Sequence, residues 1–342
     1  MKIHDNTLYI TTQGAYLSKD GTNIVVRVEK QERLRLPIHT IGGIVCFGNV
    51  ICSPFLLGLC GQEGVAVSFL SRNGRFLARL VGPQSGNLLL RRAQHNASSD
   101  SVMAAELAKV FIAAKIANTR YVLQRNLRDH PSEISQPVQS AVSYLAGLIN
   151  ELRQPLSLER IRGIEGDAAR RYFSVFDRLL TSQRSDFMFT ERSRRPPRDN
   201  INSLLSFIYT LLSHDVSAAC QSVGLDPQMG FLHADRPGRE SLALDMIEEL
   251  RPALADRFVL TLINRQQVSA KGFKKSPAGG VSMDDKTRKA ILTAWQERKT
   301  DEFVHPFLNE KISVGLLPFI QAKLLAKCLR NDIDGYPPMI WK

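Results

Sequence analysis

The sequence contains few cysteines and none of the short motifs of the commonest enzyme classes. Its five cysteines are odd in number and form no Cys-x-x-Cys pair, which argues against a disulfide framework and a zinc ribbon and fits a reducing compartment. There is no G-x-x-x-x-G-K-[ST] phosphate loop, no strand followed by G-x-G-x-x-G, no H-E-x-x-H and no G-x-S-x-G. These absences argue against the enzyme classes that the four motifs mark.

Long apolar runs are also missing. No stretch reaches the roughly 18 uninterrupted apolar residues that a membrane-spanning helix requires. The opening stretch, MKIHDNTLYITTQGAYL, lacks the basic region and apolar core of a secretory signal. We therefore expect a soluble, unprocessed, cytoplasmic protein that has no membrane partner.

Acidic residues are outnumbered by basic ones. The 342 residues carry 45 Lys and Arg against 33 Asp and Glu, a formal net charge of +12. The excess is spread along the chain, since residues 1–90 hold nine basic and five acidic residues. Such a charge favours a polyanionic partner, nucleic acid before a membrane surface, although a protein that is merely basic is the simpler alternative. The length and a hydrophobic fraction of 44% suit two domains with a substantial core.

The first eighty residues read as strands. Short apolar, β-branched runs predict strands over residues 8–12, 22–28, 41–48, 65–70 and 76–81, and residues 53–64 predict one short helix. Asp20-Gly21 and Asn73-Gly74 have the turn chemistry of tight hairpins. Residues 1–82 are therefore predicted to form a small β domain.

Helical periodicity dominates after a Gly- and Pro-containing segment. Residues 83–90 are predicted to be the linker, and residues 91–342 a larger, mainly α-helical domain, which makes the fold class α+β. Apolar residues recur at three- and four-residue steps over residues 101–126 and 138–152. Residues 271–285 are rich in Gly, Ser and Lys and predict a mobile basic loop.

One stretch, Gly230–Pro252, gathers a histidine and several carboxylates. Ser241 is the expected N-cap of a helix in which Asp245 and Glu248 are three residues apart, so that both carboxylates can converge on one point that His233 reaches across the turn. One imidazole with carboxylate oxygens suits Mn²⁺ or Mg²⁺. The alternative is a solvated acidic helix face beside an ordinary loop histidine.

A second stretch, residues 163–173, reads as a helix with small residues beside Glu165. Gly166 costs about 1 kcal/mol relative to Ala inside a helix, which suggests a packing or access requirement next to the acid. The alternative for Glu165 is an acid in the first helical turn, favoured by the helix dipole.

Three motifs in order carry a family resemblance: GIEGDAARRYF, then RRPPRDNINSLLSFIYTLL, then DPQMGFLH with GRESLALDMIEELRP. With these motifs the chain is similar to the spacer-acquisition integrase, or adaptation nuclease, of CRISPR systems, over essentially its whole length. The resemblance implies that Glu165, His233 and Glu248 are catalytic and bind Mg²⁺ or Mn²⁺. Many relatives have Asp in place of Glu248, and Asp245 matches a further acidic position beside the ligands, which makes it the alternative third ligand.

The resemblance also implies a reaction and partners. The reaction is the joining of captured DNA 3′-OH ends to the CRISPR repeat by transesterification. The partners are double-stranded DNA, a second copy of the chain through the β domain, and a small adaptation subunit that bridges two such dimers into a heterohexamer. The alternatives are a metal-dependent nuclease acting by hydrolysis and a non-catalytic DNA-binding scaffold. The candidate DNA-binding residues are Arg192, Arg194, Arg195, Arg198, Arg236, Arg239, Lys271, Lys274 and Lys275.

Overall fold

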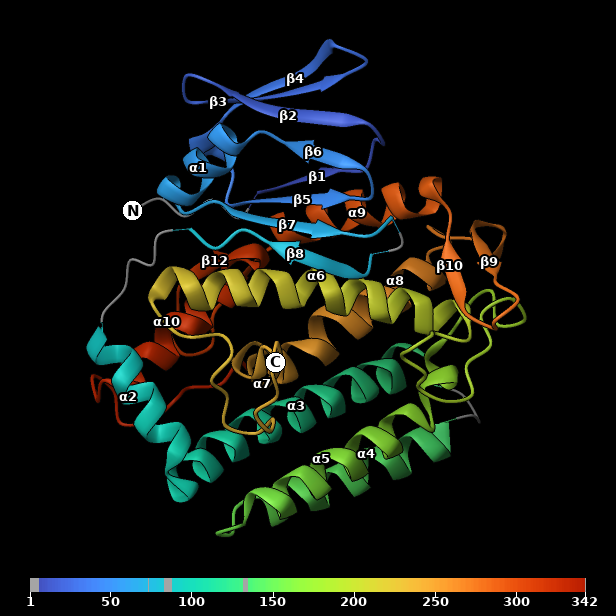
Figure 1. Ribbon diagram of the computed structural model, residues 1–342. Helices are drawn as coiled ribbons and strands as arrows, with labels where there is room; N and C mark the ends of the chain where they lie inside the picture. The colour runs from blue at the N-terminus through green and yellow to red at the C-terminus, as the bar shows by residue number, and fades with distance from the viewer. Residues whose placement is uncertain (1–5, 73, 83–87, 132–134, 342) are drawn as a thin grey trace. The chain divides into compact units, whose positions relative to one another are not determined.

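The computed structural model describes residues 6–72, 74–82, 88–131 and 135–341 (Figure 1). The chain forms two compact units. The first comprises Met1–Ser85, Met283–Val304 and Lys311–Pro318, and the second comprises Gly86–Ser282, His305–Glu310 and Phe319–Lys342. A strand-rich N-terminal region followed by a mostly helical region confirms the predicted α+β class. The domain limits 1–82 and 91–342 stay a prediction; the compact units differ from them because the first unit also takes up helix α9 (Asp285–Thr300).

Two four-stranded sheets make up most of the first unit. The order of the first sheet is β1-β5-β7-β8, and that of the second is β4-β3-β2-β6. In the first sheet β1, β5 and β7 are parallel and β8 is antiparallel to β7. The strand bounds are Thr7–Ile10, Ala15–Asp20, Asn23–Val28, Gln31–Pro37, Gly43–Phe47, Val50–Cys52, Ala66–Leu70 and Phe76–Arg79, for β1 to β8 in order.

The predicted strands of this region are present, and three further strands, β2, β4 and β6, were not predicted. In the hairpin between β2 and β3, Asp20 pairs with Asn23, and the two turn residues are Gly21, which has a φ of +58°, and Thr22. The turn is therefore one residue later than the predicted Asp20-Gly21 pair. Strands β7 and β8 pair as expected, but Asn73 lies outside the described residues.

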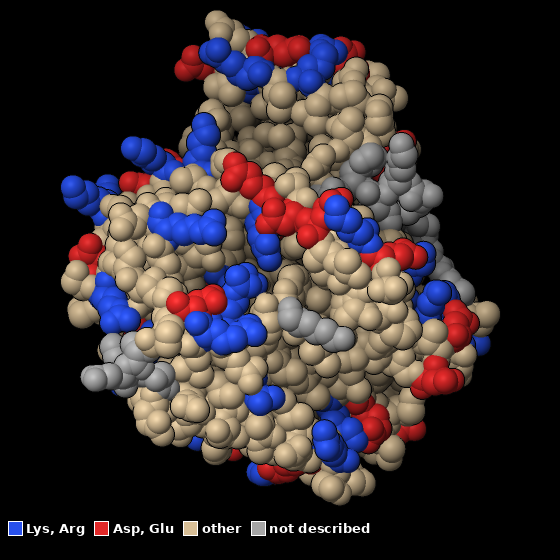
Figure 2. Space-filling view, turned by 180° about the vertical axis from the view of Figure 1, so that it is seen from behind, with Lys and Arg blue, Asp and Glu red and all other residues tan. Residues whose placement is uncertain are grey.

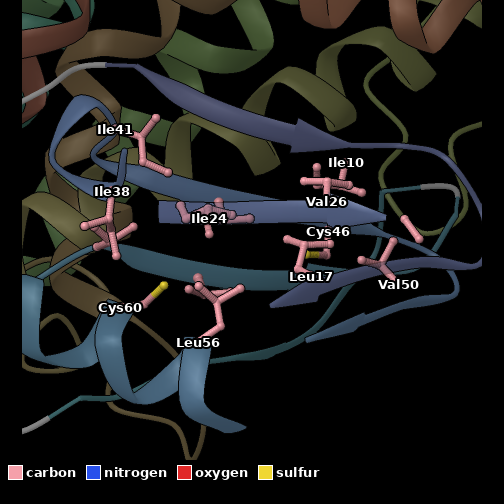
Figure 3. Packing of buried hydrophobic residues seen from close by; sticks show 14 residues of the cluster. Ile10, Leu17, Ile24, Val26, Ile38, Ile41, Cys46, Val50, Leu56 and Cys60 are labelled. Carbon is pink, nitrogen blue, oxygen red and sulfur yellow. The ribbon is translucent and has the colours of Figure 1, made fainter. Parts of the chain in front are cut away.

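The core of the first unit lies under helix α1 (Pro54–Glu63). Ser53 caps this helix by accepting a hydrogen bond from the Leu56 amide, and Gly64 ends it with a φ of +70°. Aliphatic side chains from both sheets meet Leu56 and Cys60 of the helix (Figure 3). All five cysteines are free, as expected.

The second unit is built around helix α3 (Ser101–Asp129), capped by Asp100, which packs against α2, α4, α5 and α7 (Figure 1). The other α-helices in the described part of the unit are α2 Leu88–Ser99, α4 Ser135–Glu151, α5 Leu158–Phe173, α6 Asn200–Val223, α7 Ser241–Leu250 and α8 Arg257–Asn264, with α10 Leu317–Leu329 beginning at the unit boundary. Within the predicted linker, residues 83–87 lie outside the described residues, and residues 88–90 begin α2 rather than a linker. None of the helices in the described ranges has the length and apolar character needed to cross a membrane.

Helices α7 and α8 are joined without a break by a wider π-helical segment, Arg251–Asp256. Pro252 has no amide hydrogen to donate, and a π-segment absorbs such a missing bond while the helix continues. The predicted basic loop is also more ordered than expected: β9 (Phe273–Lys275) and β10 (Val281–Met283) pair as a small two-stranded sheet. A second pair, β11 (Glu302–Val304) with β12 (Lys311–Ser313), belongs to the first unit.

Candidate metal centre

Glu165 lies in the middle of α5. The helix begins at Leu158 after the Ser157 cap, whose hydroxyl accepts a hydrogen bond from the Arg160 amide. The first-turn acid is Glu159, so the helix-dipole explanation for Glu165 is wrong. A Cβ added to Gly166 would meet no atom within 4 Å, and packing therefore does not explain that glycine.

The three carboxylates of α7 are buried, which makes the solvated-face alternative wrong. Asp245 and Glu249 are 0% exposed and Glu248 is 2% exposed. The helix begins at Ser241, so the cap position belongs to Glu240, one residue before the predicted cap, and no side chain caps it. The three acids point to three different sets of partners, and each set gives its carboxylate a different chemistry.

Asp245 organises the turn that carries His233. Its Oδ2 accepts hydrogen bonds from the amides of Phe231 at 2.6 Å and Leu232 at 2.9 Å. Its Oδ1 lies 3.1 Å from the amide nitrogen and 2.6 Å from the ring Nδ1 of His233. A Cβ on Gly230 would lie 2.7 Å from Asp245 Oδ2, so the turn requires glycine there. With these contacts Asp245 fixes the orientation of the imidazole and leaves Nε2 as the nitrogen for a ligand.

Glu248 faces cations instead. Arg251 Nη1 donates to its Oε1 at 2.7 Å, and Lys115 Nζ lies 2.6 Å from its Oε2. The same ammonium lies 2.5 Å from Glu165 Oε1. Burial alone would raise the pKa of Glu248, but Arg251 and Lys115, with His233 nearby, lower it to about 2. Glu248 is thus a buried carboxylate that stays ionised.

Lys115 is charged for the same reason. Burial alone would lower its pKa, yet the Glu248 and Glu165 carboxylates raise it above the usual value. Lys115 is 9% exposed and stands on α3 among apolar residues that cover the core face of the helix. Sequence reasoning missed it, although a Lys followed by Asn118 and Thr119 within an apolar helical period is a detectable signal.

The expected convergence of Asp245 and Glu248 on one point does not occur. The structure brings Glu165 and Glu248 to one cation, and it brings Asp245 to His233. In the described ranges, no three His, Cys, Asp or Glu side chains lie close enough together to hold a metal ion as they stand. The donor set nevertheless fits a divalent ion, because two carboxylates converge on a position already occupied by positive charge and an oriented imidazole lies near Glu248.

Glu249 turns away from these groups toward the C-terminal segment. Its Oε1 accepts from the Tyr336 hydroxyl at 2.5 Å and from Gln321 Nε2 at 3.1 Å, and its Oε2 accepts from the Met339 amide at 2.9 Å. Asn118 of α3 also binds this segment, through the Met339 carbonyl and the Trp341 amide. Burial raises the pKa of Glu249 to about 7, because its partners are neutral hydrogen-bond donors that offset only part of the desolvation.

A pocket opens beside Lys115 and Glu165. Its empty space, counted out to its open mouth, is about 450 Å³, and its lining includes Lys115, Glu165, Arg194, Arg251 and Asp256. Burial raises the pKa of Asp256 to about 6, and the Tyr209 hydroxyl donates to it at 2.5 Å. In this pocket the Glu165 carboxylate thus lies among several basic side chains.

The nine candidate DNA-binding residues differ in exposure. Arg192 is partly buried, donates to Asn202 Oδ1 at 2.6 Å and Ser206 Oγ at 3.1 Å, and stacks 5.3 Å from the Tyr209 ring centre. Arg239 is also partly buried. The exposed ones are Arg194, Arg195, Arg198, Arg236, Lys271, Lys274 and Lys275. Basic side chains on the face shown in Figure 2 occur in small groups with acidic ones between them.

Comparison with known proteins gives consistent matches. The family described as "CRISPR associated protein Cas1" matches residues 8–297. "CRISPR-associated endonuclease Cas1 1" of Chlorobaculum tepidum is 53% identical, with all of both chains covered. Among solved structures, "Casposase bound to integration product" aligns with a TM-score of 0.83 and 24% identity over 96% of this chain and 92% of that one. The "Cas6-RT-Cas1--Cas2 complex" aligns with a TM-score of 0.82 and 21% identity over all of this chain and 37% of that one.

Proposed function

The chain belongs to the CRISPR-associated Cas1 family, and from this premise we propose that it is a DNA endonuclease and integrase of CRISPR adaptation. It joins the 3′-OH ends of captured DNA to the CRISPR repeat by transesterification. The observation that carries this is the 53% identity, over the full length, with a relative named as a CRISPR-associated endonuclease. The net charge of +12 and the ionised Glu248 beside Glu165 support it.

The proposal assigns Glu165, His233 and Glu248 to one divalent ion, Mg²⁺ or Mn²⁺. When bound, the ion supplies Lewis acidity to a phosphoryl oxygen and neutralises charge that develops in the transition state. The protein contributes two carboxylates that share the Lys115 ammonium, and an imidazole whose Nδ1 is engaged by Asp245. Asp245 has both oxygens committed to backbone amides and His233, which supports a positioning role for it and a ligand role for Glu248.

Basic side chains around the site hold the DNA backbone. Arg194 lines the pocket beside Glu165, and Arg195 and Arg198 are exposed in the same segment. A guanidinium binds two phosphate oxygens at once, which fixes the strand as well as attracting it. In the joining step the attacking 3′-oxygen forms a bond to phosphorus, the repeat's own 3′-oxygen leaves, and no covalent protein intermediate is required.

The test is a joining assay with Mn²⁺ or Mg²⁺, a repeat-containing supercoiled plasmid and a duplex with free 3′-OH ends. We expect a covalently joined product from the wild type and none from Glu165→Ala, His233→Ala or Glu248→Ala, with DNA binding retained by all three. Glu159→Ala is the matched control for Glu165→Ala, because it removes an exposed carboxylate from the same helix.

Hydrolysis is the second candidate function, favoured by the word endonuclease in the relatives' names. The same ion can activate water, so the two reactions share a site. The assay separates them: cut plasmid without joined product would establish hydrolysis as the activity, and DNA binding without either product in any metal would leave a scaffold.

The proposed partners are double-stranded DNA, a second copy of the chain, and a small adaptation subunit in a heterohexamer, acting in the cytoplasm. Support for the subunit comes from the fold shared with a chain of a Cas1–Cas2 complex. Support for the homodimer comes from large apolar side chains exposed on the first unit, among them Ile51, Phe55 and Leu77. Light scattering of the protein alone should give twice the mass of the chain, and Phe55→Asp with Ile51→Asp should shift it toward the monomer.

A further inference from the structure

Lys115 occupies the place between two carboxylates where the proposed function puts a divalent ion. Its Nζ lies 2.5 Å from Glu165 Oε1 on α5 and 2.6 Å from Glu248 Oε2 on α7. Lys115 itself stands on α3, which packs against both helices. One ammonium on α3 therefore links α5 and α7, the helices that carry two of the three assigned ligands.

The charges of this group are balanced without a metal ion. The two carboxylates are matched by Lys115 and by Arg251, which is bound to Glu248 at 2.7 Å. A divalent ion bound to the same oxygens would stand beside an ammonium in a largely buried site, where like charges repel more strongly than in water because screening is weaker. The ion and the ammonium consequently cannot both hold these two oxygens.

We propose that Lys115 is an internal cation that competes with the divalent ion for Glu165 and Glu248, and thereby sets the metal affinity of the site. This inference rests on the proposed function. In the metal-free protein the ammonium keeps the two carboxylates converged. Metal binding displaces it from them toward the adjoining pocket, whose lining includes Lys115 and the Asp256 carboxylate as an alternative anion.

The test measures Mn²⁺ binding to the full-length protein without DNA, by calorimetry at one fixed pH, and needs no catalytic turnover. Lys115→Met removes the charge and keeps the length of the side chain. We expect its Mn²⁺ dissociation constant to fall about tenfold or more, because the competitor is gone, and the rise in melting temperature on adding Mn²⁺ to exceed that of the wild type. An unchanged or larger dissociation constant would overturn the inference.

Two variants separate this result from other causes. Lys109→Met is the matched control, since Lys109 lies on the same helix and pairs with Glu106 at 2.7 Å; it should bind Mn²⁺ like the wild type. Glu248→Ala tests the proposed site itself. If wild type and Glu248→Ala bind Mn²⁺ equally, the proposed metal site fails; if Glu248→Ala alone loses binding while Lys115→Met matches the wild type, only the role of Lys115 fails.

Lys115→Met leaves the buried Glu248 and the partly buried Glu165 without their shared cation and can prevent folding of the metal-free protein. Lys115→Gln, which keeps a hydrogen-bond donor, then takes its place with the same expectation. The wild type offers a measurement without any substitution: labelling of Lys115 by an amine-specific reagent, read by mass spectrometry, should rise with Mn²⁺ and should not rise in Glu248→Ala. Labelling of Lys115 that Mn²⁺ leaves unchanged would contradict displacement.

Discussion

Two neighbouring glutamates of α7 are both buried, yet their pKa values shift in opposite directions because they face different sides of the helix. Glu248 and Glu249 are both buried, at 2% and 0% exposure. On the side of the candidate metal centre the pKa of Glu248 falls to about 2 despite burial, because Arg251 and Lys115 surround it. On the side of the C-terminal segment burial raises the pKa of Glu249 to about 7, because a tyrosine, a glutamine and an amide are its partners.

The difference teaches that the partners of a carboxylate, rather than its burial, decide its charge here. Neutral donors stabilise an anion but supply no positive charge, whereas Lys115 and Arg251 supply charge at contact distance. The metal-centre side therefore keeps an anion ready for a cation. The C-terminal side uses its carboxylate as a hydrogen-bond acceptor that holds residues 336–339 against α7.

The largest effect should come from Glu248→Ala. It removes a proposed ligand and leaves Lys115 and Arg251 with one carboxylate fewer in a buried site. Joining should fall to background, and the free energy of unfolding should drop by about 3–5 kcal/mol, the usual cost of breaking a buried ion pair. Urea unfolding and the joining assay measure the two effects. Full metal-dependent joining by Glu248→Ala would instead point to Asp245 as the third ligand.

The pH dependence of stability should have opposite signs for the two glutamates in the metal-free protein. The folded-state pKa of Glu248 lies below its ordinary value of 4.5, so its contribution is complete above pH 4.5 and is lost as pH falls toward about 2. The folded-state pKa of Glu249 lies above 4.5, so stability is lost as pH rises from 4.5 through about 7. Each contribution is on the order of 3 kcal/mol, because a shift of one pKa unit corresponds to about 1.4 kcal/mol.

Urea midpoints of the wild type, Glu248→Gln and Glu249→Gln, recorded from pH 3 to 8, measure these contributions. Glu249→Gln should flatten the decline between pH 4.5 and 7, and Glu248→Gln should flatten the rise at acidic pH. Identical pH profiles for the two variants would show that the two sides of the helix do not differ as described.

A smaller effect is expected from Asp245→Asn, which tests the positioning of His233. An amide keeps the size of the side chain but replaces one acceptor oxygen with a donor, so it cannot accept from three backbone amides and the imidazole together. Metal affinity should fall about 10- to 100-fold, as is typical when the partner of a ligating histidine is lost. Calorimetric Mn²⁺ titration checks this, with Asp235→Asn in the exposed part of the same turn as the control.

The sequence predicted the α+β class, five of the eight strands of the N-terminal region, and the helices that carry the site, because local periodicity determines these features. The family resemblance, not spacing, singled out Glu165, since the long sequence gap between Glu165 and His233 is closed only by tertiary packing. The spacing of Asp245 and Glu248 was misread as convergence, because helix geometry alone does not reveal that loop amides bind the first and that cations from α3 and the π-segment bind the second. Lys115 carries a detectable signal, a lysine within an apolar helical period, but its role could not be assigned from the sequence because both of its partners stand on helices far from it in the chain.

The smallest effect should come from Tyr336→Phe on the C-terminal side. It removes the hydroxyl that donates to Glu249 at 2.5 Å, while Gln321 at 3.1 Å and the Met339 amide at 2.9 Å still donate. The free energy of unfolding at neutral pH should fall by about 1–3 kcal/mol, the cost of an unsatisfied buried group. The Tyr336 hydrogen bond lowers the pKa of Glu249. Its loss should raise that pKa further, so that the pH range over which stability declines extends above pH 7.

Joining should match that of the exposed control Tyr144→Phe. A loss of joining in Tyr336→Phe at a temperature where the variant is folded would mean that the two sides of α7 are coupled, and that Glu249 takes part in the metal centre.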